Sequence, residues 1–335
     1  MSFGKFTPLN GVLQTGELTM LTYHQSVRLQ VDNVLVQYHI FDTDEPLMVT
    51  FPPSSNAMSQ EQVDADQQAW SFQFFAKKKM NVISFNHIGG ETHYFDSAKF
   101  AAFIDDLSDS LFPFPARIGY GCSKGGFAAA FHAKALKLDK ALLLMPLSTY
   151  WQPNAPWDPK LSKHTELQVQ DMSHIDASHC ETPLTIIYDP LFIPDTLHKK
   201  RFKSCVASYR IPCVGHRIAR ALQHTGSLKE TILEFREGEI DADRFYRVAR
   251  KRKQLSYYFR SIDKSSTQKM TPKRLGVIYL HRFYQYKSQS IDLNKLKSRL
   301  QQSVEKRVNS LCGLVQGKSI IAVRNFAGGT AFMFC

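Results

Sequence analysis

The sequence predicts a mixed α/β fold, in which a mostly parallel sheet begins with an antiparallel hairpin and carries helices on both faces. Two stretches of alternating hydrophobicity, Leu18–Val31 and Val34–Phe41, flank Asp32-Asn33, a pair suited to a tight hairpin turn. Downstream, short apolar runs alternate with segments of helical spacing. That alternation is typical of right-handed βαβ crossovers and therefore of a parallel sheet.

The elements after the hairpin follow in regular order. Short apolar runs predict six strands, Leu47–Phe51, Asn81–Phe85, Arg117–Gly121, Ala141–Met145, Leu184–Tyr188 and Val206–Ile211. Helical spacing and small residues predict three helices among them, Asp64–Lys78, Ser97–Leu111 and Gly125–Leu138. Residues 147–182, rich in proline, tryptophan and histidine, interrupt the alternation, and we expect an inserted lid near the carboxyl ends of the strands.

The last third of the chain differs in charge from the rest. Residues 226–335 contain 22 lysines and arginines against 9 aspartates and glutamates, whereas residues 1–225 contain 20 against 21. A chain of 335 residues is long enough for two domains of about 150 residues each. We therefore predict an α/β-type domain over residues 1–225, followed by a basic, mostly helical C-terminal extension over residues 226–335.

Three helices are predicted in that extension, Asp241–Ile262, Pro272–Lys287 and Asp292–Val308, and the apolar segment Ile320–Cys335 is either a strand or a packing tail. No run of about 18 apolar residues is present, so we expect no transmembrane helix. The first residues lack the apolar core of a signal peptide. The six cysteines form no CxxC pair, which favours reduced thiols and a cytoplasmic location.

The strongest local signal is G-x-S-x-G, formed by Gly121, Ser123 and Gly125 between a predicted strand and a predicted helix. Glycines two residues before and after such a serine remove the side-chain clashes of a sharp, strained turn. The alternative is an ordinary glycine-rich turn or a phosphate loop. However, the order Ser-Lys-Gly differs from the Walker pattern, and a lysine replaces the third glycine of a dinucleotide loop.

A serine needs a base and a third group that orients the base. Asp189 follows one predicted strand, Asp195 lies six residues later, and His216 follows the next strand. The serine, an aspartate and the histidine thus occur in the order Ser-Asp-His along the chain. Each follows the carboxyl end of a predicted strand, which is where α/β folds bind ligands. Both carboxylates remain candidates at this point.

On these residues and motifs, positions 17–225 resemble the α/β-hydrolase fold serine hydrolase family. The resemblance implies that Ser123 is the nucleophile, His216 the base, and Asp189 or Asp195 the acid. Asp189 is preferred because it lies directly beyond a predicted strand. The resemblance also implies that the amide of Lys124 is one oxyanion donor. The second donor should come from the loop after Leu47–Phe51, where only Phe51 and Ser54 carry an amide N–H, because residues 52 and 53 are prolines.

The activity implied by the resemblance is cleavage of an ester or related acyl bond through an acyl-enzyme, and acyl transfer would use the same groups. The substrate would be a small-molecule, glycan or lipid ester, and no cofactor is expected. Asp171, His174, Asp176, His179 and Cys180 resemble a metal cluster in composition, but their spacing matches no known ligand set, so no metal is expected either.

Basic and aromatic side chains alternate over residues 244–287, which suggests a surface for an anionic partner. The alternative function is therefore an inactive scaffold whose basic region binds a polysaccharide, a membrane surface, a nucleic acid or an acidic protein. No zinc-finger or RRM signature is present, which disfavours nucleic acid. A second explanation is structural: the aromatic side chains pack on the domain and the charges are solvated.

Overall fold

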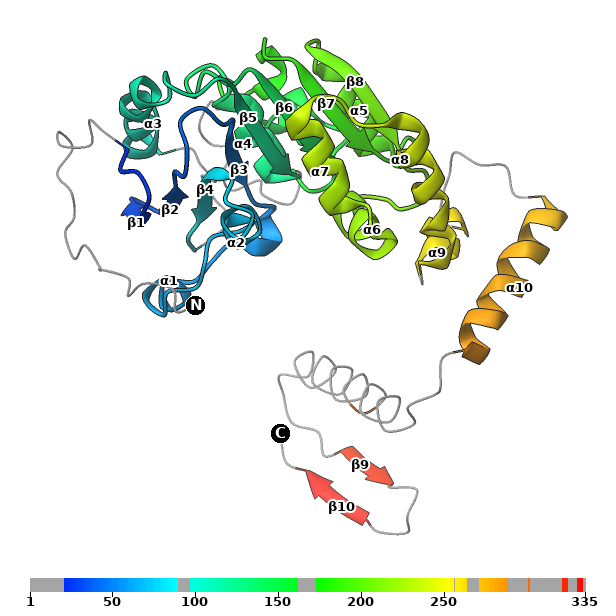
Figure 1. Ribbon diagram of the computed structural model, residues 1–335. Coiled ribbons are helices and arrows are strands. Elements are labelled where there is room, and N and C mark those ends of the chain that lie inside the picture. The colour runs from blue at the N-terminus through cyan, green and yellow to red at the C-terminus, as the bar shows by residue number, and fades with distance from the viewer. Residues whose placement is uncertain are drawn as a thin grey trace. The chain divides into compact units, whose positions relative to one another are not determined.

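The computed structural model describes residues 21–89, 97–161, 173–255, 257–263, 271–288, 301, 321–324 and 330–333. The chain divides into two units, Met1–Thr271 and Pro272–Cys335, which are described separately. The first unit contains a large sheet with its covering helices (Figure 1), and the second contains a helix and a two-stranded ribbon. Only the first unit contains the residues of the predicted site.

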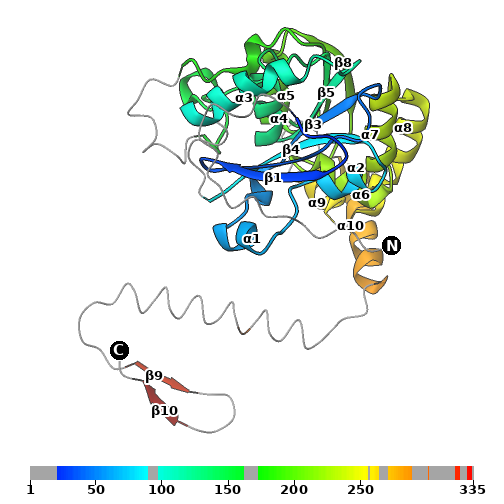
Figure 2. The same ribbon diagram turned by 60° about the vertical axis from the view of Figure 1, so that its left-hand side comes forward.

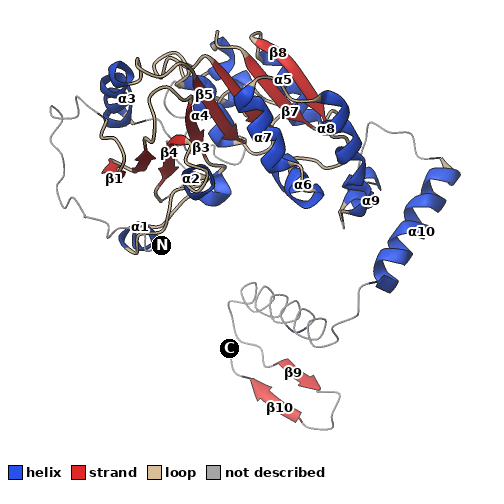
Figure 3. Cartoon of the chain, in the orientation of Figure 1, coloured by secondary structure: helices blue, strands red, loops and turns tan. Residues whose placement is uncertain are grey.

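Eight strands of the first unit form one sheet in the order β1-β2-β4-β3-β5-β6-β7-β8. β2 is antiparallel to both of its neighbours, and all other neighbouring strands are parallel. Figure 3 shows the strands in red and the helices in blue. This sheet confirms the predicted fold class. The strands are β1 (Ser26–Val31), β2 (Val34–His39), β3 (Leu47–Phe51), β4 (Asn81–His87), β5 (Arg117–Cys122), β6 (Lys140–Leu144), β7 (Leu184–Tyr188) and β8 (Cys205–Arg210).

The N-terminal hairpin closes at the predicted turn. Val31 of β1 pairs with Val34 of β2, which leaves two residues in the connection. The first of them, Asp32, has a φ of 52°. Aspartate tolerates this left-handed conformation better than most residues, and such a turn matches the twist of the two strands.

Helices cover both faces of the sheet, with α3, α4 and α5 on one side and α2, α7 and α8 on the other (Figure 2). Their bounds, with those of the other helices of this unit, are α1 (Gln60–Asp64), α2 (Phe72–Ala76), α3 (Ala98–Ser110), α4 (Lys124–Phe131), α5 (Ile193–Arg201), α6 (Ile218–Thr225), α7 (Leu228–Glu237), α8 (Ala242–Ala249) and α9 (Tyr258–Asp263). Short 3-10 helices are η1 (Ser54–Asn56), η2 (Gln152–Asn154), η4 (Ala177–His179) and η5 (Arg250–Gln254).

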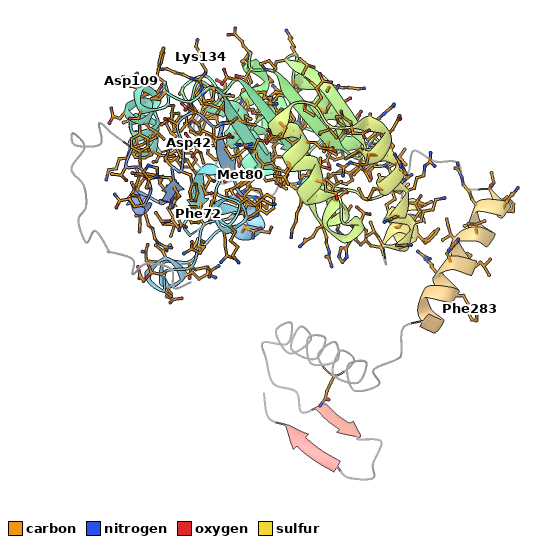
Figure 4. All side chains as sticks on the ribbon, in the orientation of Figure 1. Asp42, Phe72, Met80, Asp109, Lys134 and Phe283 are labelled. Carbon is orange, nitrogen blue, oxygen red and sulfur yellow. The ribbon has the colours of Figure 1, made fainter. Side chains whose placement is uncertain are left out.

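The main core lies between one face of the sheet and the helices α3 and α4 that cover it. Side chains fill this space (Figure 4), and aromatic rings of β3, β4 and α3 contact one another in series. The ring centroids of Phe51 and Phe85 are 4.9 Å apart, and those of Phe85 and Phe100 are 5.3 Å apart. This packing fixes the end of β3 beside the start of α4, which is where the site lies.

The helix predicted over residues 64–78 is wrong in extent, because α1 and α2 are two short helices separated by an irregular segment. Buried side chains of the sheet bind the amides of that segment: Gln37 accepts a hydrogen bond from Ala69 N (2.8 Å), and Asn86 accepts one from Trp70 N (2.9 Å). Ser71 then has a φ of 64°, which a continuous helix does not allow. Tertiary hydrogen bonds therefore replace the helical ones.

The first unit extends beyond the domain boundary predicted at residue 225. Phe245 of α8 packs edge-on against Tyr209 of β8 at 4.9 Å. Lys140 of β6 donates to the carbonyl oxygens of Phe235 and Gly238, the latter at 2.8 Å. Residues of α7 and α8 thus pack against the sheet, and the helix predicted over 241–262 is divided into α8, η5 and α9.

The second unit contains α10 (Pro272–Ser288), as predicted from the spacing, and an antiparallel pair, β9 (Ile321–Arg324) and β10 (Thr330–Met333). Phe283, labelled in Figure 4, is one of several exposed apolar side chains on α10. The helix predicted over 292–308 lies outside the described residues, apart from residue 301. Within the described part of the chain, no helix combines the length and apolarity needed to span a membrane.

Candidate active site

Ser123 occupies a sharp turn between β5 and α4. Its backbone angles are φ 55° and ψ −115°, which lie in a strained region for a residue with a side chain. A Cβ on Gly121 would collide with the backbone of Gly125, and a Cβ on Gly125 would collide with the carbonyl oxygen of Phe51. Glycine is therefore required at both flanking positions, and the turn packs directly against the end of β3.

Backbone hydrogen bonds hold this turn on both sides. Ser123 N donates to Leu144 O of the neighbouring strand at 2.9 Å, and Ser123 O accepts from Phe127 N of α4 at 3.1 Å. The serine is 7% exposed. Because the backbone is fixed on both sides, the Ser123 side chain is held in one direction, just beyond the carboxyl end of β5.

Ser123, His216 and Asp195 form a continuous hydrogen-bonded chain, called the elbow set below. Ser123 Oγ lies 2.7 Å from His216 Nε2, and His216 Nδ1 lies 2.6 Å from Asp195 Oδ1. The carboxylate can only accept, so Nδ1 carries the proton and Nε2 is left to accept the serine hydroxyl. The His216 side chain is 15% exposed and that of Asp195 is 2% exposed.

Asp189 does not occupy the position preferred for it from the sequence. Its carboxylate accepts hydrogen bonds from Val214 N (2.8 Å) and Gly215 N (2.6 Å), in the loop that leads to His216, and from Leu191 N (2.9 Å). Burial raises the pKa of Asp189, although these amides act in the opposite direction. Asp189 thus fastens the loop that carries the histidine.

Asp195 reaches the histidine because the chain turns directly after β7. Residues after Tyr188 enter α5, and Asp195 lies in the first turn of that helix. A carboxylate in the first turn of a helix is favoured by the helix dipole. The sequence preference for the residue next to the strand failed because Asp189 is used locally, within the loop.

The predicted oxyanion donors lie around the same turn. Lys124 is the first residue of α4, directly after Ser123, so its amide lies at the N-terminus of the helix. Phe51 is the last residue of β3 and is paired with Gly121 of β5, whereas Ser54 begins η1. Both alternatives for the second donor stay predictions, but the helix N-terminus beside Ser123 favours a developing negative charge there.

A second group of the same residue types, called the buried set, joins Ser148 and Asp158 of the segment predicted as a lid to His198 of α5. His198 Nδ1 lies 2.8 Å from Ser148 Oγ and accepts from Ser148 N at 3.1 Å, so Nε2 carries the proton and donates to Asp158 Oδ2 at 3.0 Å. Arg201 also donates to Ser148 Oγ, at 2.9 Å, and pairs with Asp176. The described parts of the lid segment are therefore tied to α5.

Several side chains near the elbow set were not singled out from the sequence. The ring of Phe192 lies 6.2 Å from that of His216. Burial lowers the pKa of the Lys160 ammonium, against the opposing effect of the Asp195 and Asp158 carboxylates, so this lysine lies in the field of the acid. Burial raises the pKa of the adjacent Cys122 thiol to about 12, and Asp195 adds to the effect. No sequence pattern marks these neighbours.

The metal-like composition of residues 171–180 has a different structural use. Asp176 pairs with Arg201 and accepts from Asn154 at 3.1 Å. Asp171 lies outside the described residues. In the described ranges, no three histidine, cysteine or acidic side chains are grouped so that they could hold a metal ion.

Comparison with known proteins gives structural similarity without sequence similarity. No protein-family model matches the sequence, and no curated protein matches it. The structure is similar to the Pyrococcus furiosus esterase, with a TM-score of 0.43 and 14% identity over 64% of this chain and 91% of the esterase. It is also similar to the Pyrobaculum calidifontis esterase, with a TM-score of 0.44 and 11% identity over 64% and 84% of the two chains.

A third similar structure is the capsule O-acetyltransferase of Neisseria meningitidis serogroup A, with a TM-score of 0.40 and 13% identity over 61% of this chain and 93% of that one. All three TM-scores are below 0.5. We therefore base the inferences below on the residues of this chain alone.

Proposed function

We propose that this protein is a serine hydrolase that cleaves an ester or a related acyl bond through an acyl-enzyme on Ser123. The observation that carries the proposal is the continuous hydrogen-bonded chain from Ser123 through His216 to Asp195, built on a strained turn. A weak nucleophile such as serine is activated by an adjacent base that a third group orients. Strain of this kind is concentrated at functional sites.

In the first half of the reaction, Ser123 Oγ attacks the substrate carbonyl while His216 Nε2 takes the hydroxyl proton. The charged imidazole is stabilised by the Asp195 carboxylate at Nδ1. Amide N–H groups at the start of α4, including that of Lys124, stabilise the oxygen of the tetrahedral intermediate. When the intermediate collapses, His216 gives its proton to the leaving alcohol and the acyl group stays on Ser123.

In the second half, water takes the place of the alcohol. His216 accepts a proton from the water as its oxygen attacks the acyl-enzyme, and the proton returns to Ser123 Oγ as the acid leaves. A sugar or lipid hydroxyl in place of water would accept the acyl group by the same steps. Acyl transfer is therefore a close variant of the proposed reaction.

The neighbouring thiol supports serine as the nucleophile. Because the pKa of Cys122 is raised to about 12, this cysteine remains a neutral thiol near pH 7. It is also 1% exposed. Cys122 therefore contributes packing beneath the turn, and the hydroxyl of Ser123 is the group aligned with a base.

The proposal is tested by hydrolysis of p-nitrophenyl acetate and butyrate. Wild-type protein should cleave at least one of them, and Ser123→Ala should lower kcat by at least about 10⁴-fold. Ser55→Ala, on the exposed helix η1, is a control that leaves the hydrogen-bonded chain untouched. Equal rates of cleavage by wild type and Ser123→Ala would reject the proposal, and no cleavage by either protein would favour the inactive scaffold.

A further inference from the structure

Two segments of the first unit carry positive charge without any acidic residue. Residues 211–226 contain two arginines, and residues 245–262 contain six lysines and arginines. Six of these side chains belong to residues that the structure describes as exposed, and we call them the basic surface: Arg217, Arg220, Arg247, Arg250, Lys251 and Lys253.

The two segments pack against each other beside the loop of His216. The guanidinium carbon of Arg217, the residue after the histidine, lies 4.9 Å from the centre of the Tyr257 ring. Arg220 lies 6.0 Å from the same ring. Arg252 joins the segments by donating to Pro212 O at 3.1 Å. The basic surface therefore begins at the elbow set itself.

These cations differ from other arginines of the same region. Arg244 pairs with Glu230 and Glu234, and Arg236 pairs with Glu45 and Glu237. By contrast, none of the six side chains of the basic surface forms an ion pair with a described carboxylate. Two guanidinium groups that share one ring repel each other, and a bound anion would relieve that repulsion.

The surroundings of the basic surface indicate which anion it fits. Tyr257, Tyr258 and Phe259 are at most 7% exposed, so these rings are not free to stack on nucleic acid bases. Among the described residues of 211–259, Tyr246 is the one large apolar side chain that is exposed, at 36%. A membrane anchor or a protein interface needs exposed apolar or aromatic side chains. A flexible, hydrophilic polyanion needs only the charges.

We propose that the basic surface binds an anionic polysaccharide, and that the ester handled by Ser123 is carried on that polymer. The inference rests on the proposed function and adds a substrate class to it. Carboxylate or phosphate groups along the polymer contact the arginines and lysines, and this holds an ester of the same polymer at the adjacent serine. Electrostatic attraction also raises the rate of encounter with such a substrate.

Binding is tested first, with fluorescent polygalacturonate as the probe and Ser123→Ala as the host so that no bond is cleaved. The test variant adds Lys251→Gln and Lys253→Gln. The matched control adds Lys77→Gln and Lys78→Gln, which are exposed and precede β4, a strand in the other half of the sheet from β8. We expect the test variant to bind about tenfold more weakly at about 50 mM salt and the control to match the host.

Salt and competitors identify the ligand. Raising the salt to about 200 mM should weaken binding to the host more than to the test variant, because fewer ions are released from the latter. Neutral dextran should not compete. Equal binding by test and control variants would overturn the inference, as would tighter binding to phosphatidylserine vesicles, to oligo-dT or to poly-glutamate than to polygalacturonate.

Catalysis separates this inference from the proposed function. O-acetylated polygalacturonate should be deacetylated, and the test substitutions in the Ser123 background should lower kcat/KM for the polymer about tenfold more than for p-nitrophenyl acetate. If small esters are cleaved and the lysine substitutions lower kcat/KM equally for the polymer and for p-nitrophenyl acetate, the inference fails while the proposed hydrolase function is supported. If the polymer binds but no ester of any kind is cleaved, the proposed function fails, the substrate assignment fails with it, and only the binding surface remains.

Discussion

The elbow set and the buried set contain the same three residue types joined by hydrogen bonds, and one helix contributes to both. α5 supplies Asp195 to the elbow set and His198, one turn later, to the buried set. In the elbow set the serine contacts Nε2 and the acid Nδ1, whereas in the buried set the serine contacts Nδ1 and the acid Nε2. The hydrogen-bond distances are similar in both.

The surroundings of the two serines differ. Ser148 is 0% exposed, its amide donates to the histidine, and its hydroxyl oxygen accepts from Arg201. Ser123 lies on a left-handed turn at the N-terminus of α4, with a partly exposed histidine beside it. Contact among a serine, a histidine and an aspartate therefore does not by itself mark a nucleophile. Under the proposed function, the accessible histidine, the strained turn and the helix N-terminus distinguish the elbow set from the buried set.

The same substitution, made in each set in turn, should separate the two sets by its effect on kcat. Asp195→Asn should reduce kcat about 10⁴-fold, because an amide in that position donates to Nδ1 and selects the wrong tautomer of His216. Asp158→Asn should leave kcat per folded molecule within about tenfold of wild type. Initial rates on a small ester, corrected for folded protein by circular dichroism, provide the measurement. A larger loss of kcat from Asp158→Asn than from Asp195→Asn would assign the chemistry to the buried set.

The buried set should instead determine stability. His198→Ala removes the donor to a carboxylate that is 2% exposed, and an uncompensated buried charge costs about 3–5 kcal/mol in the free energy of unfolding. His224→Ala, at an exposed position of α6, should change that free energy by less than about 0.5 kcal/mol. Urea denaturation at pH 7 compares the two. Equal midpoints would show that the buried network contributes nothing to folding.

The strained turn can be tested without touching any polar group. Gly125→Ala places a methyl group against the carbonyl oxygens of Phe51 and Pro52, so the turn must shift. A displacement of this kind should lower kcat about 100-fold while a small ester still binds. Gly276→Ala on α10, where nothing lies within 4 Å, is the control and should be silent. Wild-type kinetics in Gly125→Ala would mean that the geometry of the turn is irrelevant.

The smallest effect expected is the acid sensitivity of the buried set. Burial raises the pKa of Asp158, but hydrogen bonds from His198 and from the Lys160 amide outweigh it, so the pKa lies below the ordinary 3.8. The resulting stabilisation is complete above that value and is lost as the pH falls through the lowered pKa. The gap in unfolding free energy between wild type and Asp158→Asn should therefore be larger at pH 6 than at pH 3. A gap independent of pH would contradict this origin.

Much of the fold could be predicted because its signals are local. The alternation of apolar runs and helical segments places the strands within one or two residues, and Asp32-Asn33 marks the hairpin. The glycine spacing around Ser123 is required by the geometry of one turn, so that turn can also be predicted from the sequence. The helix predicted over 64–78 failed because Gln37 and Asn86, distant in sequence, bind its amides.

The site could be predicted only in part, for the same reason. Ser123 and His216 follow from a motif and from strand order, but the choice between Asp189 and Asp195 depends on how the chain turns after β7. The Asp189 carboxylate accepts hydrogen bonds from the amides of Gly215 and Leu191, and no rule of sequence spacing predicts these contacts. The buried set brings together residues that are 40 and 50 positions apart in the sequence, and its histidine looks like one more basic residue of α5.

The most direct measurement is covalent labelling by a fluorophosphonate followed by mass spectrometry of the peptides. The account predicts one phosphonyl group per molecule, on Ser123, with no label on Ser148 and none in the Ser123→Ala protein. Asp195→Asn should slow the labelling, and Asp158→Asn should not. Label on Ser148, or the same amount of label in Ser123→Ala as in wild type, would contradict the assignment of the nucleophile.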